Sequence, residues 1–92
     1  MITSFEHKGL ESFYRTGSKA GIQPAHAKRL SIILSLLDIA KSTDDLNVPA
    51  FALHTLKGDL RGYFAVRVSG NWRLIFKPNG ENMELIDYLD YH

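Results

Sequence analysis

The stretch that decides the fold is residues 63–77, which read Tyr63-Phe64-Ala65-Val66-Arg67-Val68-Ser69-Gly70-Asn71-Trp72-Arg73-Leu74-Ile75-Phe76-Lys77. Apolar residues recur on both sides of Ser69-Gly70-Asn71, which is typical of a β-hairpin with a glycine in its loop. If this loop has three residues, one face carries only apolar pairs: Val68 with Trp72, Val66 with Leu74 and Phe64 with Phe76. The other face then pairs Arg67 with Arg73, Ala65 with Ile75 and Tyr63 with Lys77. A two-residue loop would mix apolar and charged side chains on both faces, so we predict the three-residue loop.

The segments around this hairpin indicate a larger antiparallel sheet. We predict strands over Phe51–His54 and Met83–Tyr88, a glycine-bracketed loop over Leu56–Gly62 and a turn at Pro78–Gly80. Ile2–Phe5 has the residues for a short edge strand. Consecutive antiparallel strands of this kind form a sheet that buries one face.

The first half of the chain has helical periodicity. We predict one helix over Lys8–Thr16, stopped by Gly17, and a second from Pro24 to about Lys41, after which Ser42–Asp45 ends it. The second helix has an apolar stripe at helical spacing, formed by Leu30, Ile33, Leu34, Leu37 and Ala40. Its basic residues lie off the stripe, where we expect them to be solvated: Lys28, Arg29 and Lys41. Helices followed by hairpins predict an α+β fold, with two N-terminal helices packed on a small antiparallel sheet.

Length and composition narrow the class of protein. The chain has 92 residues, which predicts a single domain over residues 1–92 with one modest core. There is no cysteine, so neither disulfides nor thiolate metal sites are expected. No apolar run approaches the roughly 20 residues of a membrane span, and the N-terminus lacks the basic and apolar regions of a signal peptide. We therefore expect a cytoplasmic protein without a membrane partner.

Charge is distributed unevenly along the chain. The formal net charge is only +1, which by itself argues neither for nor against nucleic acid. From Lys57 to Lys77, however, five basic residues accompany the single acid Asp59, whereas the segment from Glu81 onward has four acids and no Lys or Arg. Two arginines opposite each other repel, so Arg67 and Arg73 require either a nearby carboxylate, such as Glu84 or Asp87, or a phosphate ligand. The basic middle segment followed by an acidic last segment favours a localised phosphate site. For the arginine pair itself, the choice between a carboxylate partner and a phosphate ligand remains open.

Four histidines and the C-terminal residues Asp90-Tyr91-His92 raise the question of chemistry. Imidazoles such as His54 and His92, placed near Lys and Arg side chains, suit metal-free RNA cleavage by the ribose 2′-OH. Imidazole transfers protons near neutral pH, and cations stabilise the charge that develops on phosphorus. Tyr91 can stack on an unpaired base. His7 and His26 lie near helix starts and are interpreted as surface or capping residues, and a zinc site is not supported because no His-x₃-His or Cys spacing exists.

Taken together, the motifs resemble one family, the HigB (host inhibition of growth) toxins of the RelE/ParE superfamily of bacterial toxin–antitoxin systems. The resemblance covers essentially the whole chain. It rests on these ordered pieces: Met1-Ile2-x-Ser4-Phe5, Lys8-Gly9-Leu10, Leu53-His54-x-Leu56-Lys57-Gly58-Asp59, Gly62-Tyr63, Asn71-Trp72-Arg73, Asp87-Tyr88 and the terminal Asp90-Tyr91-His92. Single pieces are weakly specific, but the complete ordered set is distinctive.

The resemblance implies a RelE-like fold and a ribosome-dependent mRNA endoribonuclease that cleaves message in the A site. It implies a cognate HigA-like helix-turn-helix antitoxin, whose complex with the toxin binds operator DNA, and no cofactor. By position, the implied catalytic residues are His54, Lys57, Arg73, Asp90, Tyr91 and His92. Arg67, from the hairpin register, and Arg61, from the basic segment, are added as substrate-binding residues together with Tyr91. Which group is the general acid and which the general base stays open.

Two other functions remain compatible with the sequence. A ParE-like protein has a similar fold and poisons gyrase without a nuclease site, although paired imidazoles have no evident use there. A non-catalytic ribosome- or RNA-binding module could also carry these residues in an inactive geometry. Codon preference, oligomeric state and the position of the antitoxin are not determined by the sequence.

Overall fold

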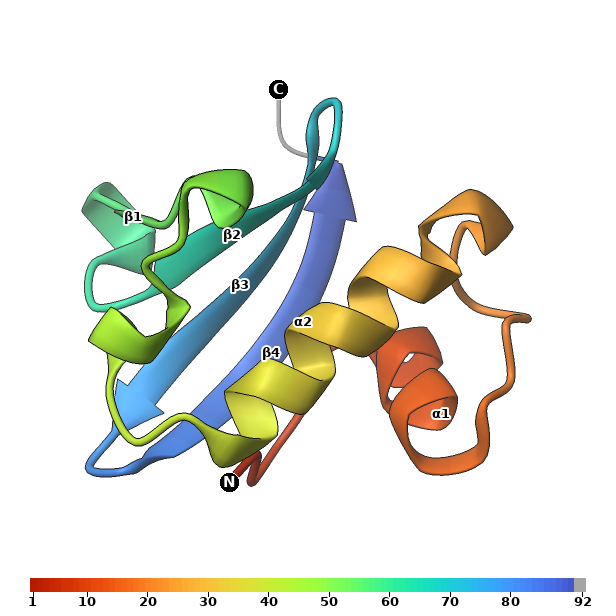
Figure 1. Ribbon diagram of the computed structural model, residues 1–92, viewed down its shortest axis with the longest axis horizontal. Helices are drawn as coiled ribbons and strands as arrows, with labels where there is room; N and C mark the ends of the chain where they lie inside the picture. Colours follow the sequence, from red (N-terminus) through yellow and green to blue (C-terminus); the bar gives the residue numbers. More distant parts are fainter. Residues whose placement is uncertain (91–92) are drawn as a thin grey trace.

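The computed structural model describes residues 1–90 and has two α-helices and a four-stranded sheet within that range. The helices are α1 (Lys8–Thr16) and α2 (Ala27–Ile39), and the strands are β1 (His54–Thr55), β2 (Phe64–Ser69), β3 (Trp72–Asn79) and β4 (Asn82–Asp90). All neighbouring strands are antiparallel, in the order β1-β2-β3-β4. Figure 1 shows α2 crossing one face of this sheet with α1 beside it. The predicted α+β fold is confirmed.

The β2–β3 hairpin has the predicted register over most of its length, with one correction at the loop. Arg67 pairs with Arg73, and the next three pairs, down to Phe64 with Phe76, follow as predicted. The predicted pair of Tyr63 with Lys77 is not part of the ladder, because β2 begins at Phe64. The three-residue loop is wrong, because Ser69 pairs with Trp72 and only Gly70 and Asn71 form the turn. A bulge between Arg67 and Ser69 restores the register. A bulge adds one unpaired residue to a strand, so a two-residue loop can keep all apolar side chains on one face.

The last strand is longer than predicted and carries a second irregularity. The β3–β4 register shifts between Ile75 and Lys77, opposite the segment that contains Leu85, whose φ is 54°. The N-terminal segment lies along the other side of β4 through two parallel bridges, Ile2 with Met83 and Phe5 with Ile86, so the expected edge strand is reduced to these contacts. The backbone N–H of Leu85 donates to the hydroxyl of Ser4. The N-terminal segment thus contributes bonds to the irregular part of β4.

Helix boundaries follow local capping. The Nδ1 of His7 accepts a hydrogen bond from the N–H of Leu10, 2.9 Å away, and Gly17 ends α1 with a φ of 81°. The second predicted helix begins as a 3₁₀ turn, η1 (Pro24–His26), before α2, and it ends at Ile39 because Ala40 is extended. Its apolar stripe is buried throughout, as predicted.

The connection between α2 and the sheet differs most from the prediction. It contains the 3₁₀ turns η2 (Thr43–Leu46) and η3 (Pro49–Phe51), so a strand over Phe51–His54 is wrong and only His54–Thr55 pairs. Pro49 starts η3, and Ala52 after it has a φ of 49°, which interrupts any extended run. A further turn, η4 (Gly58–Leu60), lies inside the predicted Leu56–Gly62 loop. The predicted Pro78–Gly80 turn is displaced, because Pro78 and Asn79 belong to β3.

The sheet buries its two faces unequally. The main core lies between the helices and the inner face, where the fully buried side chains of Val66, Leu74 and Phe76 meet α2. The outer face, which points away from the helices, has a small cluster of Leu56, Ala65 and Ile75. The loop that contains η4 supplies Leu56 and so covers part of this face, which leaves the rest open for polar side chains.

Candidate active site

The outer face of the sheet carries three of the predicted site residues. His54 pairs with Ala65, and Arg67 pairs with Arg73 two residues further along. Side chains of directly paired residues and of residues two apart lie on the same face of a sheet. His54, Arg67 and Arg73 therefore share the outer face, on three successive strands.

His54 has a defined ring orientation. Its Nδ1 lies 2.9 Å from the carbonyl oxygen of Ala52. A carbonyl only accepts hydrogen bonds, so Nδ1 carries a hydrogen and Nε2 is the atom left for proton transfer. The side chain is exposed. His54 is a diagonal neighbour of Arg67 in the sheet, and the Cα atoms of such neighbours are typically roughly 7–8 Å apart.

Arg73 is held by the turn of its own hairpin. Its Nη1 donates to the carbonyl oxygens of Gly70 and Trp72, at 2.7 and 3.0 Å. These acceptors are neutral, so they orient the guanidinium without cancelling its charge. Arg67, directly opposite, is exposed. The result is two cationic side chains on adjacent strands.

The two carboxylates that the sequence suggested as partners of this pair, Glu84 and Asp87, bond to other groups. The side chain of Glu84 accepts from the Asn79 amide, and the side chain of Asp87 accepts from the backbone N–H of Tyr88. The carboxylates named in the first explanation therefore bond to other groups, and the phosphate ligand stays a prediction.

The remaining cations of the predicted site flank η4. Lys57 immediately precedes this turn and Arg61 follows it, and both side chains are exposed. The turn itself places Leu60 against the outer-face cluster. Lys57 and Arg61 thus lie at the border of the same face, on a loop instead of a strand.

The C-terminal residues are described only as far as Asp90. Asp90 ends β4 and pairs with Trp72, while Leu89 pairs with Arg73. The predicted residues Tyr91 and His92 lie outside the described residues. The strand that leads to them thus ends beside the arginine-bearing strand.

The two histidines that we interpreted as surface or capping residues have different environments. His7 is the N-cap of α1, as that interpretation allows. His26 occupies the N-cap position of α2 without a side-chain capping bond, and it is not a surface residue. Its Nδ1 lies 2.6 Å from the hydroxyl of Tyr88, and its ring contacts Trp72. Burial raises the pKa of Tyr88 above its ordinary value. Sequence spacing offered no sign of this pair, because 62 positions separate its members.

The sequence also contained no indication of the bonds that Arg29 forms with the backbone. Arg29 was expected to be solvated, but its guanidinium bonds to the backbone carbonyls of Ala50 and Arg67. Neither acceptor has a side-chain signature that a sequence could reveal.

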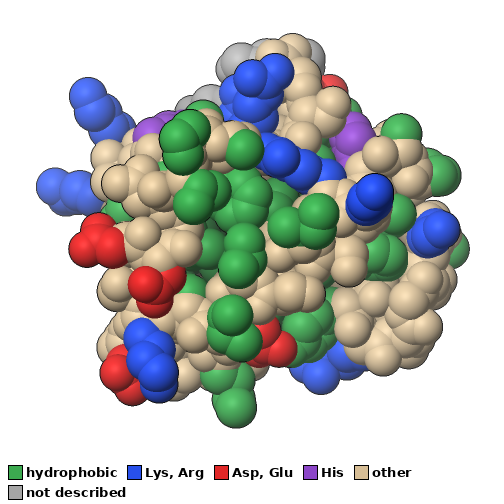
Figure 2. All heavy atoms as spheres, in the orientation of Figure 1, with side chains coloured by type: hydrophobic (Ala, Val, Ile, Leu, Met, Phe, Trp, Pro, Cys, Tyr) green, Lys and Arg blue, Asp and Glu red, His purple; other side chains and the backbone are tan. Residues whose placement is uncertain are grey.

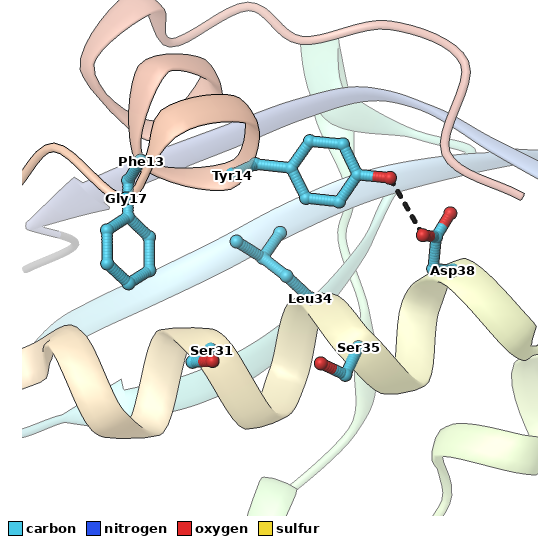
Figure 3. A pocket seen from close by; sticks show the side chains of 7 residues that line it. All are labelled: Phe13, Tyr14, Gly17, Ser31, Leu34, Ser35 and Asp38. Atoms are coloured by element: carbon cyan, nitrogen blue, oxygen red, sulfur yellow. Dashed lines mark hydrogen bonds between the residues drawn. The ribbon is translucent and has the colours of Figure 1, made fainter.

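A pocket of about 340 Å³ lies on the opposite side of the molecule, between the two helices (Figure 3). It is lined by Phe13, Tyr14, Gly17, Ser31, Leu34, Ser35 and Asp38. The Tyr14 hydroxyl donates to the Asp38 carboxylate at 2.7 Å, and the N–H of Ile2 donates to its other oxygen at 3.1 Å. The Ile2 N–H, followed by the Tyr14 hydroxyl, holds the pKa of Asp38 below its ordinary value, and the bond to Asp38 raises the pKa of Tyr14. None of the predicted site residues within 1–90 lines this pocket.

The helical side also differs in surface character from the outer face of the sheet. Ile32 and Ile39 of α2 are exposed, as is Val48 between η2 and η3, and Figure 2 shows hydrophobic side chains gathered in the middle of its view. Within residues 1–90, neither helix is long and apolar enough to cross a membrane, and no three His, Asp or Glu side chains are grouped so as to hold a metal ion. The predicted site residues within 1–90 lie on the sheet and its flanking loop.

Comparison with known protein families matches residues 3–92 to the RelE-like toxin of the type II toxin–antitoxin system HigB. Two curated relatives align along the whole chain. The chain is 36% identical to "Endoribonuclease HigB" of Proteus vulgaris over 92 residues, which is 100% of both chains. It is 33% identical to "Toxin HigB-1" of Vibrio cholerae serotype O1 over 94 residues, covering 100% of this chain and 98% of the relative.

Solved structures support the fold. The YoeB dimer from Staphylococcus aureus superposes with a TM-score of 0.62 at 18% identity, covering 99% of this chain and 94% of that chain. YafQ from E. coli superposes with a TM-score of 0.60 at 18% identity, covering 92% and 86%. At these identities the likeness concerns the fold alone.

Proposed function

Because this chain belongs to the RelE-like HigB toxins of type II toxin–antitoxin systems and is homologous over its full length to an endoribonuclease, we propose that it cleaves mRNA during translation. The cleavage takes place in the ribosomal A site and arrests growth. The observation that carries this proposal is the placement of His54, Arg67 and Arg73 on one open face of the sheet.

The proposed chemistry is metal-free transfer of the phosphodiester to the ribose 2′-oxygen. The 2′-oxygen attacks phosphorus while its proton passes to a base, and the bond from phosphorus to the 5′-oxygen breaks as that oxygen gains a proton. The products are a 2′,3′-cyclic phosphate and a 5′-hydroxyl. His54 exchanges one of these protons through Nε2, because Nδ1 is bonded to the Ala52 carbonyl.

The cations stabilise the charge on the phosphoryl oxygens. Arg73 is preorganised by its bonds to two backbone carbonyls, so it needs little reorganisation during the reaction. Lys57 supplies a second cation, while Arg67 and Arg61 bind flanking phosphates. Guanidinium groups match pairs of phosphate oxygens with two parallel hydrogen bonds.

The C-terminal residues complete the proposed site. His92 is the second proton-transfer group, Asp90 orients an imidazole and Tyr91 stacks on a base or orients the substrate. The cleavage is ribosome-dependent because a net charge of +1 provides few phosphate contacts for holding free RNA. The ribosome then supplies the binding that the toxin lacks.

Membership of a type II system implies a cognate antitoxin. We propose that this antitoxin is a HigA-like helix-turn-helix protein, that the complex binds its own operator DNA, and that the toxin acts in the cytoplasm. Co-purification of the two proteins and a shift of operator DNA by the complex, but not by the toxin alone, are the expected results.

The test of the proposed activity is cleavage of an end-labelled mRNA on purified ribosomes paused with an empty A site. We expect cleavage only with ribosomes, leaving a 2′,3′-cyclic phosphate. Efficient cleavage of free RNA would contradict ribosome dependence, and a 3′-hydroxyl product would contradict the metal-free mechanism. Intact mRNA with inhibited gyrase would favour a ParE-like activity, and ribosome binding without either effect would favour a non-catalytic module.

A further inference from the structure

Arg29 connects three separate parts of the chain. It lies on α2, its Nη2 donates to the Arg67 carbonyl at 3.0 Å and to the Ala50 carbonyl, and its Nε lies 3.4 Å from the Arg67 carbonyl. The guanidinium carbon lies 5.2 Å from the centre of the Phe51 ring. One side chain from the helical layer therefore binds the backbone of β2 and the backbone of η3.

The bond from Arg29 to the Ala50 carbonyl holds the backbone segment that also bonds to His54. Ala50 lies within η3, and Ala52, just after it, has a φ of 49°. Residues other than glycine rarely adopt this conformation, so surrounding contacts must hold the segment in place. The carbonyl of this same Ala52 accepts the hydrogen bond from Nδ1 of His54. The orientation of the imidazole thus depends on a backbone segment that Arg29 anchors.

The bond from Arg29 to the Arg67 carbonyl holds the backbone of β2 near its end. The Arg67 carbonyl lies where the β2–β3 register shifts, at the bulge before Ser69. A bulge locally disrupts the ladder of backbone hydrogen bonds, so an external donor can determine how the strand bends there. Arg29 supplies that donor at the residue that pairs with Arg73.

We propose that Arg29 is a positioning residue, which sets the His54 imidazole and the Arg67–Arg73 pair at their mutual spacing on the outer face. The inference rests on the proposed function for its catalytic consequence. Arginine is required because its planar group directs several N–H donors in fixed directions, whereas the single ammonium of lysine does not. A displacement of about 1 Å between reacting groups can lower a rate by as much as about a hundredfold.

The test compares Arg29→Ala and Arg29→Lys with Lys28→Ala, which removes the same charge from an exposed neighbouring position on α2. Cleavage on paused ribosomes gives kcat and KM, and NMR spectra report the His54 imidazole and the backbone amides of residues 50–54 and 66–69. We expect both Arg29 variants to lower kcat tenfold or more, with KM within threefold of the wild type and shifted His54 resonances. Lys28→Ala should match the wild type in kcat, in KM and in its His54 resonances.

The inference would be overturned by wild-type kcat in a folded Arg29→Ala, by wild-type kcat in Arg29→Lys, or by an equal loss of kcat in Lys28→Ala. If Arg29→Ala fails to fold, Arg29→Lys decides. If wild-type protein does not cleave mRNA, the proposed function fails, and the NMR comparison then decides the positioning claim on its own. Unchanged resonances of His54 and of residues 66–69 in the Arg29 variants would refute it.

Discussion

Arg67 and Arg73 lie directly opposite each other on neighbouring antiparallel strands, and the suggested partners Glu84 and Asp87 bond to other groups. Like charges in this arrangement destabilise a sheet, by up to about 1 kcal/mol. On the function proposed above, the RNA backbone would supply an anion with several oxygens that relieves this repulsion.

Arg73→Ala should abolish toxicity while the protein remains folded. Loss of one preorganised donor to a developing oxyanion costs on the order of 3 kcal/mol, or about a hundredfold in rate or more. Trp72→Ala is the contrasting variant, because Trp72 stacks on Tyr88 with ring centres 4.7 Å apart and should cost about 3 kcal/mol of stability. Growth arrest and thermal unfolding measure the two effects. If Arg73→Ala unfolded while Trp72→Ala stayed as stable as the wild type, the assignment of Arg73 to the outer face and Trp72 to the core-facing side would be contradicted.

His54→Asn and His54→Gln should separate orientation from proton transfer. The Asn side-chain NH₂ can replace the Nδ1 bond to the Ala52 carbonyl, but neither amide can exchange a proton near neutral pH. We expect cleavage to fall by roughly a hundredfold or more in both variants. Because His54 is exposed, melting temperatures should remain close to that of the wild type. Substantial cleavage by His54→Asn would assign His54 to structure instead of catalysis.

Asp38 should make folding stability depend on acidic pH. Its pKa lies below the ordinary value of 3.8, chiefly because of the Ile2 N–H and then the Tyr14 hydroxyl. A carboxyl with a lowered folded pKa contributes its full stabilisation above the unfolded pKa, and this contribution disappears as the pH falls through the folded pKa. Urea unfolding between pH 6 and 2, as chosen test conditions, should therefore show a smaller acid-induced loss in Asp38→Asn than in the wild type.

Tyr14→Phe is the matched control for this effect, because it removes only one of the two bonds to Asp38. It should lie between the wild type and Asp38→Asn in its acid dependence. None of these groups lies among the proposed site residues, so cleavage at neutral pH should be unchanged in both variants. Identical acid profiles in all three proteins would show that Asp38 does not contribute.

Deletion of His92 should remove cleavage with little change in stability. Residues after the last strand of a domain usually add little folding free energy, so we expect a change within about 0.5 kcal/mol. As a proton-transfer group, His92 should contribute roughly a hundred- to ten-thousandfold in rate. Growth arrest and melting temperature should be compared for the wild type, the deletion and a form with residues added after His92. A fully toxic deletion would leave His54 as the imidazole candidate.

Periodicity was sufficient for the main architecture. Alternating apolar residues in the β2–β3 segment and the helical stripe of α2 identified the core faces correctly, because burial of apolar area dominates both patterns. The pairing of Arg67 with Arg73 followed from the same alternation. The loop detail did not, since a bulge at Val68 and a two-residue turn leave the same apolar face as a three-residue loop. Hydrophobic patterning alone cannot separate these two solutions.

Arg29 and His26 show which features lay beyond the sequence. Both are polar residues near the start of a helix. Arg29 was expected to be solvated, and His26 was interpreted as a surface or capping residue. Their partners are distant in the chain: the backbone carbonyl of Arg67 for one and the hydroxyl of Tyr88 for the other. A backbone carbonyl is the same at every residue, so no sequence pattern marks it as an acceptor. Local propensities and apolar periodicity act between near neighbours and set the elements, whereas these long-range polar contacts exist only once the helical layer has packed against the sheet.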